Sequence, residues 1–396
     1  MKYPFIPFIV TLISIFLLAS CDKEDALTTA TVPVNQTVSE SRSRGNSTEL
    51  QEFKEYLQEE MEDQHIPALS VLIFEEDEIL YEGYFGKSNI QQNRNLRNND
   101  LFLLASVSKV VTAAALLQLY EDGAFSLNDP INDYLPFEVN HPRYNTPITF
   151  KMLLTHTSGI IDGEGFYGDY SYGVDSPIAL KDYLMDYLVP GGENYHARQN
   201  FSRSRPGRKY EYTNAGNALI GVLVAEIAEM DFSDYCQQHI FNPLGMNHTA
   251  WHLADIRQFI VQPYDYINGR NKAIGQYTFP DYPNGGLRST ARDLFKFLQA
   301  FVLNGKSQGY QLLNPSTIRM MRTPQIGNRN RDMGLHLFRM DRSENLWGHD
   351  GGEQGVATTV AFNPTTKMGA IILTNQGEAD LEDLLLESYW MGFELW

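Results

Sequence analysis

Segments with the pattern of β-strands lie near both ends of this chain, and a long helical stretch separates them. Residues 68–74 and 78–85 are rich in apolar, β-branched and aromatic side chains and predict one hairpin. Residues 356–362 and 368–374 predict a second hairpin. Between about 100 and 300, helical periodicity and loops dominate. We therefore expect an α+β fold, in which distant segments form one antiparallel sheet and a helical region packs beside it.

Two helices are expected to flank this sheet. The first begins near Glu49 and places four apolar residues on one face: Leu50, Phe53, Leu57 and Met61. The second follows Asp380, a helix-capping residue type, and carries four leucines: Leu381, Leu384, Leu385 and Leu386. We expect one domain over 49–396, with its sheet part at about 49–100 and 285–396 and its helical part at about 101–284.

The first 20 residues have the layout of a secretory signal peptide. An apolar run over about 5–18 follows a lysine, and Cys21 comes directly after small residues. This ending looks like a bacterial lipobox, in which the cysteine is acylated and becomes the mature amino terminus. A transmembrane anchor is the alternative, but the run is short for a bilayer. Residues 1–20 are predicted as a lipoprotein signal peptide and 21–48 as a flexible linker, with lipid on Cys21 as the membrane anchor.

These features predict an exported bacterial lipoprotein of the cell envelope. Residues 22–25 are mostly acidic and resemble the surface-export signals of some lipoproteins, although a solvated tether has the same composition. The periplasmic face and the cell surface both remain open as locations.

Composition excludes several classes of function. The chain has 396 residues, with 31 Lys and Arg against 49 Asp and Glu, which gives a net charge of −18. Phosphate affinity comes mainly from basic side chains, so a nucleic-acid partner is not expected. Only two cysteines, Cys21 and Cys236, are present, which excludes a disulfide scaffold and a Cys-rich metal centre. His156 and His349 lack metal-ligand spacing, so we expect no metal and no cofactor, and Cys236 is predicted to be a small buried hydrophobe.

The first candidate motif is Ser106-Val107-Ser108-Lys109. Ser106 is expected near the start of a helix, where backbone N–H groups favour developing negative charge. Lys109 lies three residues on, one turn away on the same side. A buried lysine loses its charge because desolvation lowers its pKa, and the neutral amine can take the serine proton. A capping serine and an exposed lysine would give the same four letters.

The second motif is Tyr212-Thr213-Asn214, before a helix expected to start near Asn214 to Asn217. The tyrosine can relay a proton between the serine and a leaving group, and the asparagine can hydrogen-bond an amide-like substrate. The third motif is His349-Asp350-Gly351-Gly352, expected as a glycine-rich loop before the strand at 356–362. Its glycines allow close approach of a ligand, and the Gly352 N–H can pair with that of Ser106 as an oxyanion hole.

Together, these three motifs in this order resemble the serine β-lactamase and penicillin-binding-protein superfamily, and most of all its class C β-lactamase-like branch. That branch includes esterases, DD-peptidases and D-aminopeptidases. The resemblance covers roughly residues 49–396. Three further stretches are similar to family signatures, and we expect them to be structural: residues 153–159, 243–246 and 285–294.

The resemblance implies a β-lactamase/transpeptidase-like fold and a role for each motif residue. Ser106 is the expected acylated nucleophile, Lys109 its base partner and Tyr212 the catalytic tyrosine. Asn214 is the expected contact to the substrate carbonyl. His349 stands where lactamases carry a lysine, and Gly351 and Gly352 belong to the substrate-binding and oxyanion region, with Gly352 as the second donor.

The histidine at 349 favours an esterase or peptidase over a β-lactamase. A lysine there gives a fixed positive charge for a substrate carboxylate, whereas the charge of His349 is expected to depend on pH and Asp350 to oppose an anion. The predicted function is a serine hydrolase that cleaves a small-molecule or peptide-like ester or amide through an acyl-enzyme. A β-lactamase or DD-carboxypeptidase is the alternative. A non-turnover penicillin-type sensor is an alternative of another class.

Residues 161–205 are rich in glycine and tyrosine. One hypothesis is an aromatic rim that selects a bulky or sugar-containing substrate. A packed surface insertion is the alternative.

Overall fold

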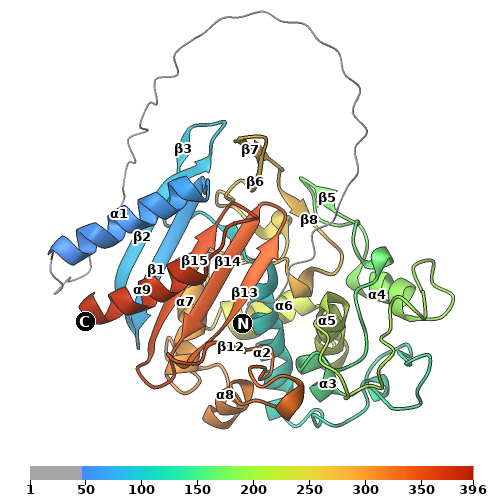
Figure 1. Ribbon diagram of the computed structural model, residues 1–396. Helices are drawn as coiled ribbons and strands as arrows, with labels where there is room; N and C mark the ends of the chain where they lie inside the picture. Colours follow the sequence, from blue (N-terminus) through green and yellow to red (C-terminus); the bar gives the residue numbers. More distant parts are fainter. Residues whose placement is uncertain (1–46, 396) are drawn as a thin grey trace, which may run out of the picture. The chain divides into compact units, whose positions relative to one another are not determined.

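The computed structural model describes residues 47–395, and its main element is a seven-stranded antiparallel sheet (Figure 1). The strand order is β12-β13-β14-β15-β1-β2-β3. The strands are β1 (Ala68–Glu75), β2 (Glu78–Asn89), β3 (Arg94–Asn95), β12 (Phe338–Asp341), β13 (Leu346–Glu353), β14 (Val356–Phe362) and β15 (Met368–Thr374). The α+β fold class expected from the sequence is confirmed.

The two predicted hairpins meet at the centre of this sheet. Strand β15 lies between β1 and β14, with Ile372 opposite Val71 on one side and opposite Thr359 on the other. Strands from the beginning and the end of the domain are therefore direct neighbours. Strands β1 and β15 are both apolar runs with little alternation of polar and apolar residues. This pattern is expected for strands in a sheet that is covered on both faces.

Helices cover both faces of the sheet (Figure 1). On one face, α1 (Ser47–Asp63) and α9 (Glu382–Leu395) pack on each other and on alternate residues of the central strands, such as Val71 and Ile73. On the other face, α7 (Ala291–Val302) packs on β1 and β15, with the ring of Phe295 5.1 Å from that of Phe74. Burying one such side chain contributes about 1.5–3 kcal/mol.

The remaining helices are α2 (Ser108–Glu121), α3 (Phe150–Leu154), α4 (Leu180–Leu188), α5 (Asn214–Ala228), α6 (Phe232–Cys236) and α8 (Pro315–Met321). Paired short strands are β4 (Phe102–Leu103) with β9 (Arg288–Ser289), β5 (Ser171–Tyr172) with β8 (Tyr277–Thr278), β6 (Tyr264–Ile267) with β7 (Arg270–Ala273), and β10 (Lys306–Ser307) with β11 (Tyr310–Gln311).

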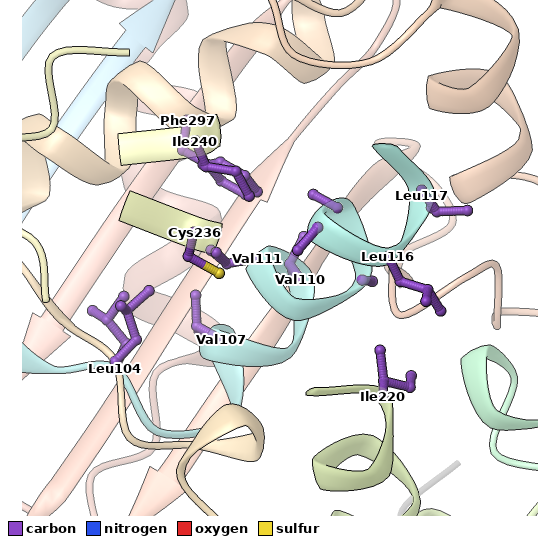
Figure 2. Packing of buried hydrophobic residues seen from close by; sticks show 14 of the residues in the cluster. Leu104, Val107, Val110, Val111, Leu116, Leu117, Ile220, Cys236, Ile240 and Phe297 are labelled. Carbon is purple, nitrogen blue, oxygen red and sulfur yellow. The ribbon is translucent and has the colours of Figure 1, made fainter. Parts of the chain in front are cut away.

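Helix α2 runs through the interior, and residues from Ser108 to Leu119 are buried on all of its sides. Figure 2 shows Val110 and Val111 among side chains from other elements, including Ile220 of α5. Cys236 is a free, buried thiol in the same core, as expected, and burial raises its pKa. A helix enclosed in this way is a rigid support for residues at its start.

One local expectation is wrong. The sequence His349 to Gly352 was expected as a loop before a strand, but it lies inside β13, which pairs with β14 from Trp347 to Glu353. Glycine, histidine and aspartate have little intrinsic preference for strands. Pairing with the strongly β-forming strand β14 therefore determines this conformation, not the local sequence.

The predicted signal peptide, Cys21 as the predicted lipidation site and most of the predicted linker at 21–48 lie outside the described residues. Within residues 47–395, no helix is both long enough and apolar enough to cross a membrane.

Candidate active site

Ser106 lies in a 3-10 turn, η1 (Ala105–Val107), which leads directly into α2. The turn is held against the sheet, because the Leu104 carbonyl accepts a hydrogen bond from Thr358 Oγ1 at 2.8 Å. Ala105 has a φ of +47°, a left-handed conformation that residues other than glycine seldom adopt. This bend leaves Ser106 half-buried at the start of the helix, where N–H groups favour developing negative charge.

Lys109 is completely buried, and its amine lies beside the serine hydroxyl. The distance from Lys109 Nζ to Ser106 Oγ is 3.0 Å, and Nζ also donates to the carbonyl oxygen of Asn284 at 2.7 Å. Burial lowers the pKa of Lys109 to about 7, while the nearby carboxylates of Asp162, Asp281 and Glu353 act in the opposite direction. A substantial fraction of this amine is therefore neutral at neutral pH.

The start of α5 fixes the second motif. Thr213 is the N-cap residue, and its Oγ1 accepts from the Gly216 N–H at 3.2 Å. The Asp162 carboxylate accepts from the N–H groups of Asn214 and Ala215 at 2.7 and 3.0 Å and from Thr213 Oγ1 at 2.8 Å. The predicted helix start near Asn214 is confirmed.

Tyr212 precedes this cap and lies over the lysine. Lys109 Nζ is 5.1 Å from the centre of the Tyr212 ring. Desolvation raises the pKa of Tyr212, and a hydrogen bond with the Ser106 side chain acts in the opposite direction. About 36% of the Tyr212 surface remains exposed, so the ring borders the open side of the site. Tyr212 is thus close in space to Ser106 and Lys109, although it belongs to a different motif of the sequence.

Asn214 lies at the same place. Its Nδ2 donates to the Tyr167 hydroxyl at 3.1 Å. Its Oδ1 is buried and has no hydrogen-bond partner among the described residues. Because buried acceptors are normally paired, this amide oxygen is available to a donor on a bound molecule.

His349 points into the same region, with its ring centre 6.4 Å from that of Tyr212. Its Nδ1 is 2.6 Å from the carbonyl oxygen of Asp350, so Nδ1 carries the proton and Nε2 is the bare acceptor. Nε2 is buried and unpartnered within 47–395. Burial lowers the pKa of His349 to about 3, and positive charge on Lys109 acts in the same direction. This corrects the expectation of a pH-dependent charge: His349 is neutral throughout the ordinary pH range.

Asp350 also differs from expectation. Its carboxylate accepts a hydrogen bond from Thr359 Oγ1 of β14 at 2.6 Å. Successive residues of a strand face opposite sides of the sheet, so Asp350 points away from the side that His349 occupies. It therefore does not stand opposite an anion in the site.

The two glycines of β13, Gly351 and Gly352, differ in the space around them. A Cβ on Gly351 would lie 2.4 Å from the Leu104 carbonyl oxygen and 3.1 Å from Ala105 Cβ, so a side chain there would push η1 away. A Cβ on Gly352 would meet nothing within 4 Å, so Gly352 faces open space. The main chain of Gly351 and Gly352 thus lies beside the turn that carries Ser106.

Besides Asp162, sequence reasoning missed three acidic or amide residues of the site, Asp281, Asn284 and Glu353. The Asn284 side chain donates to the carboxylate and the carbonyl of Asp281, so Asn284 connects Asp281 with Lys109. Burial raises the pKa of Asp281 to about 7. Burial also raises the pKa of Glu353, whose Oε1 accepts from the Tyr170 hydroxyl at 3.0 Å. Asp281 and Asn284 come just before the signature at 285–294, which was the one local signal available.

Two buried histidines were also missed as neighbours of the site. His156 and His336 are fully buried, and their ring centres are 4.6 Å apart. Burial holds the pKa of each well below its ordinary value, with His349 and Lys109 acting in the same direction. His156 belongs to the signature at 153–159, which was expected to be structural.

The tyrosine-rich segment borders a pocket that is also lined by Asn214 and Asn284. This pocket is lined by residues that include Tyr167, Tyr170, Asn214, Asp281 and Glu353. A separate cavity of about 460 Å³ shares only Phe279 and Pro280 with it. The pocket next to the tyrosine-rich segment is the one connected to the catalytic residues, because Asn284 lines it. The carbonyl oxygen of Asn284 accepts a hydrogen bond from the Lys109 amine. No group of three or more His, Cys, Asp or Glu side chains within residues 47–395 is arranged to hold a metal ion.

This geometry suits nucleophilic attack by a hydroxyl. A serine at a helix start, a fully buried amine at hydrogen-bond distance and a phenol above them are the elements of a Ser-x-x-Lys nucleophile.

A family model described as Beta-lactamase matches residues 53–387. The chain belongs to the β-lactamase family. This family is of the serine-hydrolase type and includes penicillin-binding proteins.

Curated relatives and solved structures agree with this membership. Protein flp of Staphylococcus aureus is 23% identical over 333 residues, which cover 82% of this chain and 63% of flp. Penicillin-binding protein 4* of Bacillus subtilis is 26% identical over 337 residues, which cover 81% and 70%. The octameric penicillin-binding protein homologue from Pyrococcus abyssi has a TM-score of 0.69 at 21% identity, over 87% of this chain and 77% of that one. The chain thus spans under two thirds of the length of flp, and the structural match concerns the fold.

Proposed function

We propose that this protein is a cell-envelope serine hydrolase that cleaves an uncharged ester or amide through an acyl-enzyme on Ser106. The observation that carries this proposal is the 3.0 Å separation between Ser106 Oγ and the fully buried Lys109 Nζ, whose pKa is lowered to about 7. Such an amine is neutral often enough to accept a proton and basic enough to hold it.

In the first half of the proposed reaction, neutral Lys109 takes the Ser106 proton as Oγ bonds to the substrate carbonyl carbon. The carbonyl oxygen becomes an oxyanion, which the N–H groups of Ser106 and Gly352 stabilise. The carbonyl re-forms, the bond to the leaving group breaks, and the proton passes from Lys109 to the leaving oxygen or nitrogen by way of Tyr212. This step leaves an acyl-enzyme and a free alcohol or amine.

In the second half, water adds to the acyl carbon and gives its proton to the same base pair. Collapse of the second tetrahedral intermediate breaks the bond to Ser106 Oγ, which recovers its proton. The products are a carboxylic acid and the regenerated hydroxyl. Asn214, with its unpaired Oδ1, would hold an N–H group of an amide-like substrate.

The charges around the site favour an uncharged substrate over one with a carboxylate. His349 is neutral, because burial lowers its pKa to about 3, so the position lacks a fixed positive charge. Asp162 and Glu353 are close enough to influence Lys109 electrostatically. A substrate carboxylate would meet these acidic groups without the fixed positive charge that a lysine at position 349 would supply. These features support an esterase or peptidase rather than a β-lactamase or DD-carboxypeptidase, within the class C β-lactamase-like branch.

The proposal includes the amino-terminal features of the sequence. A lipid on Cys21 would attach the protein to a membrane, and the polar segment at 21–48 would hold the domain away from the surface. The protein would then act at the bacterial cell envelope.

A pair of chromogenic esters matched in size tests the proposal. 4-Nitrophenyl butyrate is neutral, whereas the mono-4-nitrophenyl ester of succinate carries a carboxylate. We expect kcat/KM to be about tenfold or more higher for the butyrate, from one like-charge interaction at moderate range. Ser106→Ala should abolish hydrolysis of both esters.

Three outcomes would contradict the proposal. Faster hydrolysis of the succinate ester or of a chromogenic cephalosporin would favour the lactamase alternative. A stable adduct on Ser106 without product release would favour a sensor. Full activity in the Ser106→Ala variant would refute the mechanism.

A further inference from the structure

His156 is a buried histidine with a left-handed backbone. Its exposed surface is 0%, and its φ is +51°. Residues other than glycine seldom adopt this conformation, and histidine is among the few that do so more readily, together with asparagine and aspartate. It lies two residues after the end of α3.

Three contacts join His156 to the segment that carries Tyr212. The His156 carbonyl accepts from the Glu211 N–H at 2.8 Å, and His156 Nδ1 accepts from the Thr213 N–H at 3.2 Å. The imidazole packs on the Tyr212 ring, with 4.4 Å between centres and 34° between planes. The residues before and after the tyrosine and the tyrosine ring itself are therefore all held by one residue.

The hydrogen bonds define the state of the imidazole. Nδ1 accepts from a backbone N–H, so the neutral ring carries its proton on Nε2. Nε2 is buried and finds no hydrogen-bond partner in the part of the chain that the structure describes. The His336 ring makes an edge-to-face contact with His156, and burial, together with His336, Lys109 and His349, lowers the pKa of His156 and disfavours a second proton.

The unpartnered nitrogen argues against a packing role. A hydrocarbon side chain of similar size would fill the space without burying an unsatisfied N–H group, which is unfavourable. An aliphatic side chain would supply neither the acceptor for the Thr213 N–H nor the flat ring that packs on Tyr212. The two contacts are therefore what the histidine provides at this position.

We infer that His156 is a positioning residue for Tyr212, and that it fixes the phenol over Lys109 and Ser106 by holding the backbone on both sides and the ring face. This inference rests on the proposed function for its kinetic consequence, because Tyr212 is the group proposed to relay the proton. The signature at 153–159 was expected to be structural, and this inference gives one of its residues, His156, a role in positioning a catalytic side chain.

Two substitutions separate the contacts. His156→Leu removes both the acceptor and the flat ring. His156→Asn keeps an acceptor for the Thr213 N–H and a residue type that tolerates positive φ, but it lacks the ring. We expect kcat for 4-nitrophenyl butyrate to fall on the order of 100-fold in the leucine variant, as for displacement of a catalytic group by about 1 Å, and about tenfold in the asparagine variant. KM should change less than kcat in both.

The same substitutions in a Tyr212→Phe background complete a double-mutant cycle. Without the phenol oxygen there is nothing left to position, so His156→Leu should then lower kcat by less than about threefold. His65 offers a matched control, because it also has a positive φ, +56°, and stacks on a tyrosine, Tyr266, at 3.7 Å. His65→Asn should leave kcat unchanged.

An equal loss of kcat with the native tyrosine and in the Tyr212→Phe background would overturn the inference, as would equal damage from leucine and asparagine. A crystal structure of the His156→Leu variant shows directly, without a turnover measurement, whether His156 positions the Tyr212 ring. A displaced Tyr212 ring supports the inference, and an unmoved ring overturns it. Absence of Ser106-dependent hydrolysis in the wild-type protein would instead count against the proposed function alone.

Discussion

The proposed chemistry depends on Lys109, whose side-chain amine is buried inside the protein. Lys109 has no exposed surface, and its amine is held between the Ser106 hydroxyl and the Asn284 carbonyl. The spacing of three residues allowed this pair, because such side chains lie on one side of a helix, but only the family resemblance favoured it over an exposed lysine. The sequence could not predict the carboxylates that moderate the lysine pKa, because Asp162, Asp281 and Glu353 come from distant segments.

The lowered pKa of Lys109 predicts the pH dependence of activity. The neutral amine is the active form, so kcat/KM for a neutral ester should rise with pH through about 7 and level off above it. His349 is not the cause, because its pKa of about 3 leaves it neutral over this range. The measurement is kcat/KM between about pH 5 and about pH 9. A flat profile, or a limb that disappears in His349→Asn, would contradict the assignment.

Restoring a positive charge at position 349 should change substrate preference. His349→Lys places an ammonium group where the wild-type protein has a neutral imidazole. We expect the kcat/KM ratio of the succinate ester to the butyrate ester to rise about tenfold, by the same Coulomb argument. The added charge should also lower the Lys109 pKa and move the acidic limb to lower pH. An unchanged ratio would show that charge at this position does not set preference.

At the level of elements, the contact between β13 and η1 holds the nucleophile in place. The sequence predicted β14 and β15 because each is a run of β-branched and apolar residues, and both were found at the expected residues. Strand β13 was missed because His349 to Gly352 lack that preference and acquire a strand conformation only by pairing with β14. The role of Gly351 was also invisible, since it depends on the carbonyl of Leu104, which is distant in sequence.

The two glycines of β13 provide a matched pair of substitutions. A methyl group on Gly351 would lie 2.4 Å from the Leu104 carbonyl oxygen, so Gly351→Ala should lower the free energy of unfolding by about 3 kcal/mol and reduce activity. Gly352→Ala enters open space and should change stability by less than about 0.5 kcal/mol. Urea unfolding of both variants is the measurement. Similar stability for the two would show that the sheet can move away from η1.

At the scale of the whole molecule, the fold brings the two ends of the domain together in one sheet and places the site beside it. The fold class followed from the sequence because the predicted hairpins at 68–85 and 356–374 lie on either side of a helical region. The convergence of Ser106, Tyr212 and His349 did not follow from local pattern. It depends on the packing of α2, α5 and β13, and only resemblance to a family indicated it.

The amino-terminal sequence predicts where the molecule resides. If Cys21 carries lipid, Cys21→Ser should move the protein from the membrane fraction to the soluble fraction, because each buried CH₂ of an acyl chain contributes about 0.8 kcal/mol to membrane binding. Fractionation with radiolabelled palmitate measures both location and lipid. A wild-type protein without label, or a variant that stays with the membrane, would contradict the lipoprotein assignment.

The central claim is that Ser106 forms an acyl-enzyme, and its most direct test is the mass of the peptide that contains Ser106 during turnover. The protein is mixed with 4-nitrophenyl butyrate, quenched in acid within a fraction of a second, digested and analysed by mass spectrometry. We predict a butyryl group on the peptide that contains Ser106, which appears before steady state and is absent from the Lys109→Met variant. Hydrolysis that proceeds without any acyl group on Ser106 would contradict the account.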